Sequence, residues 1–117
     1  LTTLTIDGFR VLMGKNNTQN EFLTLKKAAK TDLWLHARQI PGSHVVIETE
    51  GLTVPLATIE KAAALAAWNS KGKDSGKVDV DYTLIRYVKK IPNGPPGLVN
   101  YTHQKTIAAI PTDIKDE

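Results

Sequence analysis

Apolar and polar residues alternate in short runs along most of this chain, a pattern typical of half-buried β-strands. The first two runs cover residues 2–6 and 9–13, and the Asp7-Gly8 pair between them is typical of a tight hairpin turn. Further runs cover residues 32–38, 41–47 and 78–83, the first two of them joined by a short turn. The sequence therefore predicts a mostly antiparallel sheet built from hairpins.

The last third of the chain predicts further strands around a rigid loop. Residues 85–90 are expected to continue the preceding strand or to pair with it. Residues 98–101 and 106–110 are expected to form a last hairpin. Three prolines and two glycines within residues 92–97 predict a turn-rich loop that cannot join a central strand ladder.

Two segments show helical spacing of apolar residues. Thr18 and Glu21 predict a capping box at the start of the first helix, which is expected to extend to about Ala29. Pro55 suits the first turn of the second helix, which ends at Trp68. Six alanines lie within this second helix, and their small side chains allow it to pack close against a sheet.

These elements predict a single α+β domain: a mostly antiparallel sheet carrying two helices. The 117 residues, 41% of them hydrophobic and 23% charged, suffice for one folded domain rather than a disordered chain. The domain is expected to cover residues 1–111, followed by an acidic, flexible tail over 112–117. Trp68 and Tyr82 fall with the apolar residues of their elements and are assigned to the core.

Composition narrows the class of protein. There is no cysteine, which excludes a disulfide framework and thiolate metal sites and fits a reducing compartment. No apolar run approaches the roughly 20 residues of a membrane span, so no membrane partner is expected. The net charge is only +3, but basic residues are concentrated in residues 10–38 and 71–105. If these two segments meet, they form a positive surface that suits phosphates; otherwise they are two separate solvated faces.

The strand over residues 32–38 places unusual side chains on one face. Leu33, Leu35 and Ala37 are expected to face the core, which leaves Trp34, His36 and Arg38 on the opposite face. Left exposed, that row would offer an aromatic stacking surface for unpaired RNA bases. A helix covering this second face would instead bury Trp34.

The sequence offers little for catalysis or metal binding. Ser43 and His44 are adjacent in an extended segment, so their side chains are expected to point to opposite faces. His36 and His44 lack a close second pair of ligands for a metal. We therefore expect no enzyme activity, metal or cofactor, and treat the histidines as hydrogen-bonding residues.

The segment before the first helix is a candidate phosphate site. Gly14 and Lys15 are followed by Asn16 and Asn17 at the expected helix start, with Asn20 one turn further on. Backbone N–H groups, amide side chains and a lysine are suitable donors for phosphate. The same residues are also ordinary turn formers.

Several of these segments together resemble the NFACT-R domain, the C-terminal module of the NFACT family. The Asp-Leu-Trp-Leu-His-Ala segment at 32–37 and the Pro-Gly-Ser-His-Val-Val-Ile segment at 41–47 are the most specific. The remaining matches, in the same order, are Gly-Lys-Asn-Asn at 14–17 with Asn20, Val-Asp-Tyr-Thr at 80–83, Val-Lys-Lys at 88–90 and Pro-Gly-Leu-Val at 96–99.

The resemblance implies a cytoplasmic, non-catalytic RNA-binding module whose partners are tRNA, the large ribosomal subunit and other domains of its parent protein. Such a parent would act on stalled nascent chains in ribosome-associated quality control. The expected RNA-binding residues are Lys15, Asn16, Asn17, Asn20, Trp34, His36, Arg38, Ser43, His44, Lys89, Lys90 and Lys105. Among them, Ser43 and His44 are expected to shape the turn.

Two other classes of function stay open. Some bacterial members of the family are labelled fibronectin- or fibrinogen-binding, so an adhesin module is the main alternative. A purely structural module that docks on another domain of the same polypeptide is the third hypothesis.

Overall fold

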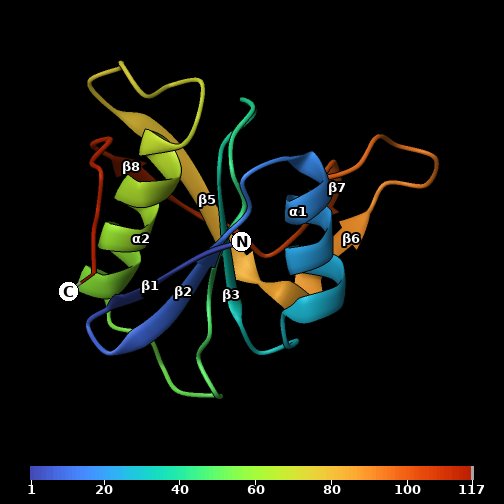
Figure 1. The fold of residues 1–117 in the computed structure, drawn as a ribbon, viewed down its shortest axis with the longest axis horizontal. Coiled ribbons are helices and arrows are strands. Elements are labelled where there is room, and N and C mark those ends of the chain that lie inside the picture. Colours follow the sequence, from blue (N-terminus) through green and yellow to red (C-terminus); the bar gives the residue numbers. More distant parts are fainter. Residues whose placement is uncertain (117) are drawn as a thin grey trace.

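The computed structural model describes residues 1–116 and shows a central sheet with one layer of structure on each face (Figure 1). The sheet has six strands in the order β1-β2-β4-β3-β5-β8, and every adjacent pair is antiparallel. Its strands are β1 (Thr2–Ile6), β2 (Phe9–Met13), β3 (Leu33–Ala37), β4 (Val45–Ile47), β5 (Val78–Leu84) and β8 (Lys105–Ala109). The predicted α+β class is confirmed.

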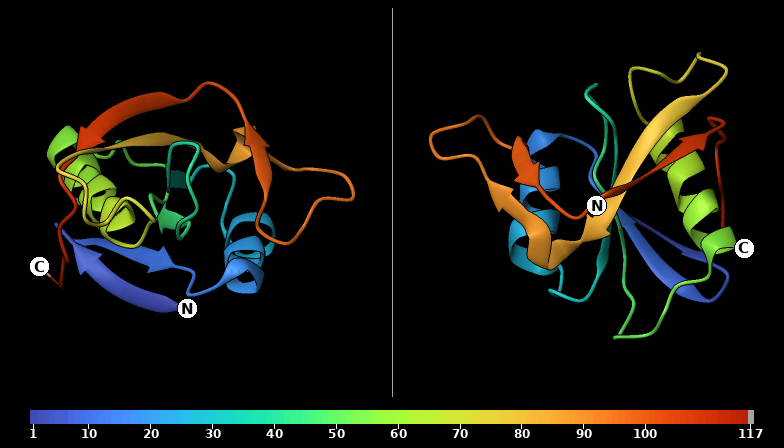
Figure 2. Two further views of the ribbon diagram at one scale, coloured as in Figure 1. Left: turned by 90° about the horizontal axis from the view of Figure 1, so that it is seen from above. Right: turned by 180° about the vertical axis from the view of Figure 1, so that it is seen from behind.

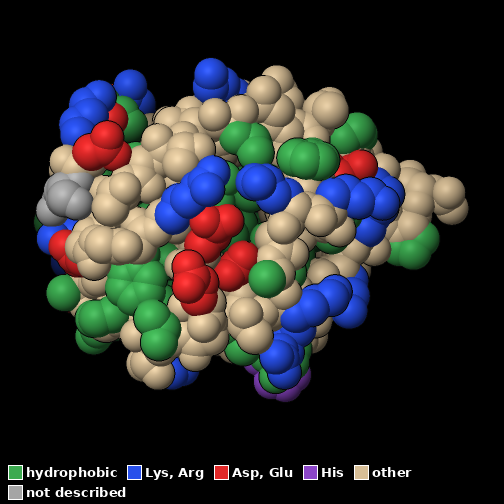
Figure 3. All heavy atoms as spheres, turned by 60° about the horizontal axis from the view of Figure 1, so that its bottom comes forward, with side chains coloured by type: hydrophobic (Ala, Val, Ile, Leu, Met, Phe, Trp, Pro, Cys, Tyr) green, Lys and Arg blue, Asp and Glu red, His purple; other side chains and the backbone are tan. Residues whose placement is uncertain are grey.

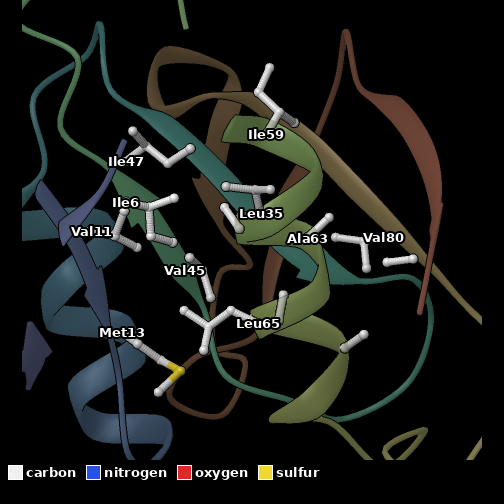
Figure 4. Packing of buried hydrophobic residues seen from close by; sticks show 14 of the residues in the cluster. Ile6, Val11, Met13, Leu35, Val45, Ile47, Ile59, Ala63, Leu65 and Val80 are labelled. Atoms are coloured by element: carbon white, nitrogen blue, oxygen red, sulfur yellow. The ribbon is translucent and has the colours of Figure 1, made fainter. Parts of the chain in front are cut away.

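Helix α2 (Leu56–Trp68) covers one face of the sheet. Four of its alanines, Ala62, Ala63, Ala66 and Ala67, are completely buried. These small side chains let the helix lie close to the sheet. Ile59 and Leu65 of the helix pack with alternate residues of β1, β2, β3, β4 and β5 in one core cluster (Figure 4). The expected close packing of an alanine-rich helix is confirmed.

The opposite face carries a second layer made of two elements. Helix α1 (Asn17–Phe22) continues into the π-helical turn η1 (Leu23–Lys27), and β6 (Val88–Lys90) pairs with β7 (Val99–Tyr101) in a separate two-stranded sheet. Figure 2 shows the β6–β7 hairpin beside α1 from a second direction. Side chains of the two elements meet the sheet in a second core cluster of Leu12, Leu23, Trp34, Val46, Ile85 and Val88.

Two predicted pairings are wrong. Residues 85–87 form the short 3₁₀ turn η2 (Ile85–Tyr87), which directs β6 away from β5. Strand β7 then pairs with β6, whereas β8 returns to the large sheet beside β5. The predicted hairpin between residues 98–101 and 106–110 does not form.

Two local assignments also need correction. The first helix is capped by Asn16, whose side chain accepts a hydrogen bond from the Gln19 N–H at 2.9 Å, rather than by a Thr18 capping box. Glu21 is engaged elsewhere, with Lys90. Trp68 lies outside both core clusters: it is half-buried, with Lys73 Nζ 4.2 Å from its ring centroid. Tyr82 packs against the core as expected, although it is only partly buried.

The end of the chain lies against α2 and β1. The Thr112 N–H donates to the Ala64 carbonyl, and Asp116 accepts a hydrogen bond from the Thr5 N–H. Ile114 packs against the α2 side of the core. The flexibility of residues 112–117 stays a prediction, and residue 117 lies outside the described residues.

The close fit of α2 predicts sensitivity to side-chain volume. Replacing buried Ala66 by leucine is expected to lower the free energy of unfolding by about 1–3 kcal/mol, because the helix cannot move away from the sheet without losing contacts. The same change at exposed Ala57 of this helix is expected to alter it by less than about 0.5 kcal/mol. Urea unfolding of both variants measures the difference; equal effects would contradict close packing.

Candidate RNA-binding site

Three chain segments meet at one end of the second layer. They are the start of α1, the loop between β3 and β4, and the proline-rich loop between β6 and β7. The β3–β4 loop also forms a bridge with the segment after α2, through Gly42 and Ser70. Two hollows open on this end of the molecule, and they contain most of the residues that the sequence singled out.

We call the first the polar hollow, which has a volume of about 340 Å³. It is lined by Lys15, Asn16, Asn17, Asn20, Pro41, Gly42, Ser43, Asn69, Ser70 and Lys71. Two lysines and several amide or hydroxyl groups thus face one space whose lining includes no carboxylate. One lysine comes from each of the two basic segments, so the segments contact each other at this hollow. That their other cations share one positive surface stays a prediction.

We call the second the aromatic cleft, which has a volume of about 500 Å³. Its ring-bearing residues are Trp34, His36, His44 and Tyr101. The remaining lining residues are Asn17, Asn20, Gln39, Ile40, Pro41, Gly42, Pro95, Pro96, Gly97, Leu98 and Val99. None of these side chains carries a formal charge when the histidines are neutral.

Trp34 and His36 do share the sheet face opposite the α2 layer, as the alternation predicted. Of the two alternatives left open for Trp34, burial is the one that the structure shows, because α1, η1 and the β6–β7 hairpin cover it and leave it 0% exposed. Its ring forms the floor of the aromatic cleft, with the Tyr101 ring centroid at 4.7 Å and that of His36, stacked nearly parallel, at 5.7 Å. Direct stacking of an RNA base on Trp34 is therefore withdrawn.

His44 connects the layers around this floor. Its Nδ1 accepts a hydrogen bond from the Trp34 indole N–H at 3.1 Å and lies 2.7 Å from Thr24 Oγ1. Because an indole N–H can only donate, Nδ1 carries no proton, and the neutral ring is protonated on Nε2. The ring also hydrogen-bonds the backbone of Gly97 in the proline-rich loop. One buried imidazole thus touches β3, η1 and the β6–β7 loop.

Burial lowers the pKa of His44 to about 3, and the nearby His36 imidazole acts in the same direction. Burial also lowers the pKa of His36, although its hydrogen bond to the Gly42 carbonyl and the Asp81 carboxylate oppose this shift. Both rings are therefore neutral hydrogen-bonding groups at pH 7. This agrees with the structural role that the sequence analysis gave to the histidines.

Tyr101 of β7 is fixed by Asp81 on strand β5 of the large sheet. The Tyr101 hydroxyl donates to one carboxylate oxygen at 2.6 Å, and the Thr106 hydroxyl donates to the other at 2.7 Å. Burial, with this hydrogen bond and the Asp81 charge, raises the pKa of Tyr101, while the positive charge of nearby Arg38 opposes the rise. The Tyr101 ring is held in one position on the cleft wall.

Asn20 braces the start of α1 against the β3–β4 loop. It is 3% exposed, its Oδ1 accepts from the His44 backbone N–H at 3.1 Å, and its Nδ2 lies 3.5 Å from the Gly42 carbonyl oxygen. A Cβ at Gly14 would collide with this side chain, which explains the glycine there. The amide is therefore occupied by the protein, and the structure favours a positioning role over RNA contact.

The proline-rich loop is held by a second set of contacts. Lys90 Nζ lies 2.6 Å from Glu21 Oε1, and the same oxygen accepts from the Gly97 N–H at 3.3 Å. The contacts lower the pKa of the Glu21 carboxyl. Gly97 adopts a φ of +86° with its backbone next to Asn17, a conformation and approach that suit glycine. Lys90 therefore has a partner within the protein.

The remaining predicted residues are distributed unevenly. Lys15, Asn16, Asn17 and Ser43 line the polar hollow, whereas exposed Arg38, Lys89 and Lys105 line neither space. Ser43 and His44 line different spaces, as their alternation predicted. In residues 1–116, no group of three or more metal-ligating side chains is present.

Sequence reasoning missed several residues of this region. Lys71 was noted only as the start of a basic segment, and Asn69 and Ser70 only as residues beyond the second helix. Tyr101 was assigned only to a strand. The basic charge of Lys71 was the one available signal, since nothing local to the sequence predicts that its loop meets Pro41 and Gly42.

The buried, neutral His44 predicts a loss of stability in acid. Its pKa is lower in the folded state than in the unfolded chain, so folding is favoured above the unfolded pKa and this stabilisation decreases as pH falls from about 6.5 towards 3. Between pH 7 and pH 5 we expect about 2 kcal/mol of it to be lost. Urea unfolding at both values measures this.

The control is His44→Gln, which has no titrating ring at this position. It is expected to be less stable at pH 7 but to show a smaller difference between the two pH values, with the remainder due to His36 and other groups. An unchanged pH dependence in this variant would contradict a buried, neutral His44.

Comparison with known proteins assigns this chain to a family. The model of the NFACT protein RNA-binding domain matches residues 1–102. The Rqc2 homolog RqcH of Bacillus subtilis (strain 168) is 53% identical over 105 residues, which cover 89% of this chain and 18% of that protein. The Rqc2 homolog RqcH of Streptococcus suis (strain 05ZYH33) is 47% identical, over 90% of this chain and 19% of that protein.

A solved structure has the same fold. The C-terminal part of the fibronectin/fibrinogen-binding protein from Streptococcus suis superimposes with a TM-score of 0.87 at 46% identity, covering 94% of this chain and 45% of the solved one. The chain spans about a fifth of the length of the curated relatives that it matches. The resemblance identified from the sequence is confirmed, and the chain belongs to the NFACT protein RNA-binding domain family.

Proposed function

We propose that this domain binds tRNA or the RNA of the large ribosomal subunit, as part of a cytoplasmic ribosome quality-control factor that acts on stalled nascent chains. The names of the RqcH relatives and of the family support this role. The observation that carries it in this chain is the polar hollow, where Lys15 and Lys71 meet without a carboxylate in the lining. The domain then contributes binding, not catalysis.

Further cationic groups lie away from the hollow. Lys26 and Lys27 of η1 and Lys89 of β6 are exposed. Figure 3 views the molecule from the end opposite the hollow and shows Lys and Arg side chains on that surface, with a group of Asp and Glu side chains among them. Separate cationic groups along one face can follow successive phosphates, which a single pocket cannot do. Asn16 and Asn17 provide further donors at the hollow.

A second candidate comes from the printed name of the solved relative, a fibronectin/fibrinogen-binding protein. Protein binding of this kind would use surface complementarity and would not release a large number of counterions. Salt dependence therefore separates the two candidates.

Within residues 1–116, no helix combines the length and the hydropathy that a membrane span requires.

Removing either lysine of the hollow is expected to weaken RNA binding for all sequences about equally. In Lys15→Ala and Lys71→Ala, the slope of log affinity against log salt concentration should fall by about one unit, because one phosphate contact is lost. Titration of this chain with tRNA across a salt series measures both quantities. Lys115→Ala is the matched control, since Lys115 is exposed and pairs with Asp113 on the segment beside α2.

An RNA affinity that does not depend on salt, or an equal effect of all three variants, would contradict the role of the hollow. Salt-insensitive binding of fibronectin together with no binding of tRNA would favour the second candidate.

A further inference from the structure

We propose that the aromatic cleft receives the base of one unpaired RNA nucleotide while the polar hollow holds the adjoining phosphate. This inference deepens the proposed function, on which it rests, by naming the chemical form of RNA that the site selects. The first support is continuity: the two spaces share Asn17, Asn20, Pro41 and Gly42 in their linings. A ligand that occupies both passes over this shared wall.

The chemistry of the two spaces matches the two parts of a nucleotide. The polar hollow presents two ammonium groups and amide or hydroxyl donors, which suit a phosphate. The cleft presents rings, prolines and aliphatic side chains without a formal charge, which suit the faces of a flat, weakly polar base. Its volume of about 500 Å³ lies within the roughly 300–1,000 Å³ of small-molecule sites.

The walls of the cleft are fixed before any ligand arrives. Gly97 is tied to Glu21 and His44, and the Tyr101 hydroxyl is tied to Asp81. On the other wall, the His36 ring is hydrogen-bonded to the Gly42 carbonyl at 3.2 Å. A site with fixed walls loses little conformational entropy when it binds a rigid ring. This distinguishes the cleft from a gap between mobile loops.

The lining of the aromatic cleft favours an unpaired base over a base within a duplex. A base within a helix presents only its edge, and its faces are covered by neighbouring bases, so it cannot enter a cleft of this kind. Leu98, 49% exposed, and Gln39, exposed on the β3–β4 loop, both line the cleft. The Gln39 amide has no hydrogen-bond partner within residues 1–116, so it is free to contact the polar edge of a base.

The test compares two RNAs that differ by one base. The isotopically labelled chain is titrated with a single-stranded adenosine tetranucleotide, and with the same tetranucleotide carrying an abasic second residue. Both have the same phosphates. The Trp34 indole N–H resonance reports on the cleft floor, and that of Trp68, outside the cleft lining, is the internal control. We expect the intact RNA to shift the Trp34 resonance and to bind roughly 5- to 150-fold tighter than the abasic RNA.

Variants test the same point from the protein side. Leu98→Ala is expected to weaken binding of the intact tetranucleotide by about fivefold, since part of the apolar contact is lost, and to leave the abasic RNA unaffected. Leu56→Ala is the matched control, because Leu56 is also exposed, at 59%, but lies at the start of α2. It should affect neither RNA.

Each other outcome contradicts a defined part of the account. Equal binding of the two RNAs with an unmoved Trp34 resonance would overturn the base site and leave RNA binding by the hollow intact. No binding of either RNA at low salt would overturn both. A Trp34 resonance that moves with a proline-rich peptide but not with RNA would make the cleft a peptide site and overturn the inference.

Discussion

The buried imidazole of His44 holds together the end of the domain that carries the two hollows. It sits where β4 begins, accepts the Trp34 indole hydrogen at the bottom of the aromatic cleft, and contacts Thr24 of η1 and the backbone of Gly97. Leaving any one of these polar groups buried without a partner would cost about 1–3 kcal/mol. In residues 1–116 no buried side-chain nitrogen or oxygen lacks a partner. The second layer is therefore specified by polar contacts as well as by apolar packing.

This arrangement separates stability from recognition. The α2 side of the sheet supplies the larger apolar core, with alanines in close contact with the strands. The opposite layer is smaller and ends in loops, which a rigid scaffold can present to a ligand. Lys15 and Lys71 reach one hollow only because the β3–β4 loop bridges to the segment after α2. The proposed RNA site thus depends on contacts between segments that are distant in sequence.

The sequence predicts local secondary structure and which side chains share a strand face, but it does not predict which elements cover that face. Alternation with the Asp7-Gly8 turn was sufficient for the first hairpin, and helical spacing for α2. Alternation also placed Trp34 opposite the α2 face, yet it carries no information about a second layer, so it could not decide between an exposed and a buried Trp34. The pairing of β7 with β6 depends on the η2 turn, which directs β6 away from the large sheet, and local sequence patterns do not predict which of two nearby strands β7 joins. For the same reason Lys71 was missed: its charge was visible, while its neighbours across the fold were not.

The most direct test of the central claim is native-state hydrogen exchange of the Trp34 indole N–H. If the His44 cluster is closed and joins the layers, this hydrogen exchanges only when the domain unfolds globally, with a free energy close to that of the most protected amides of β3 and β5. Complete exchange within minutes, while the amides of β3 and β5 stay protected, would show that the second layer opens independently. That result would contradict the account of a pre-formed cleft.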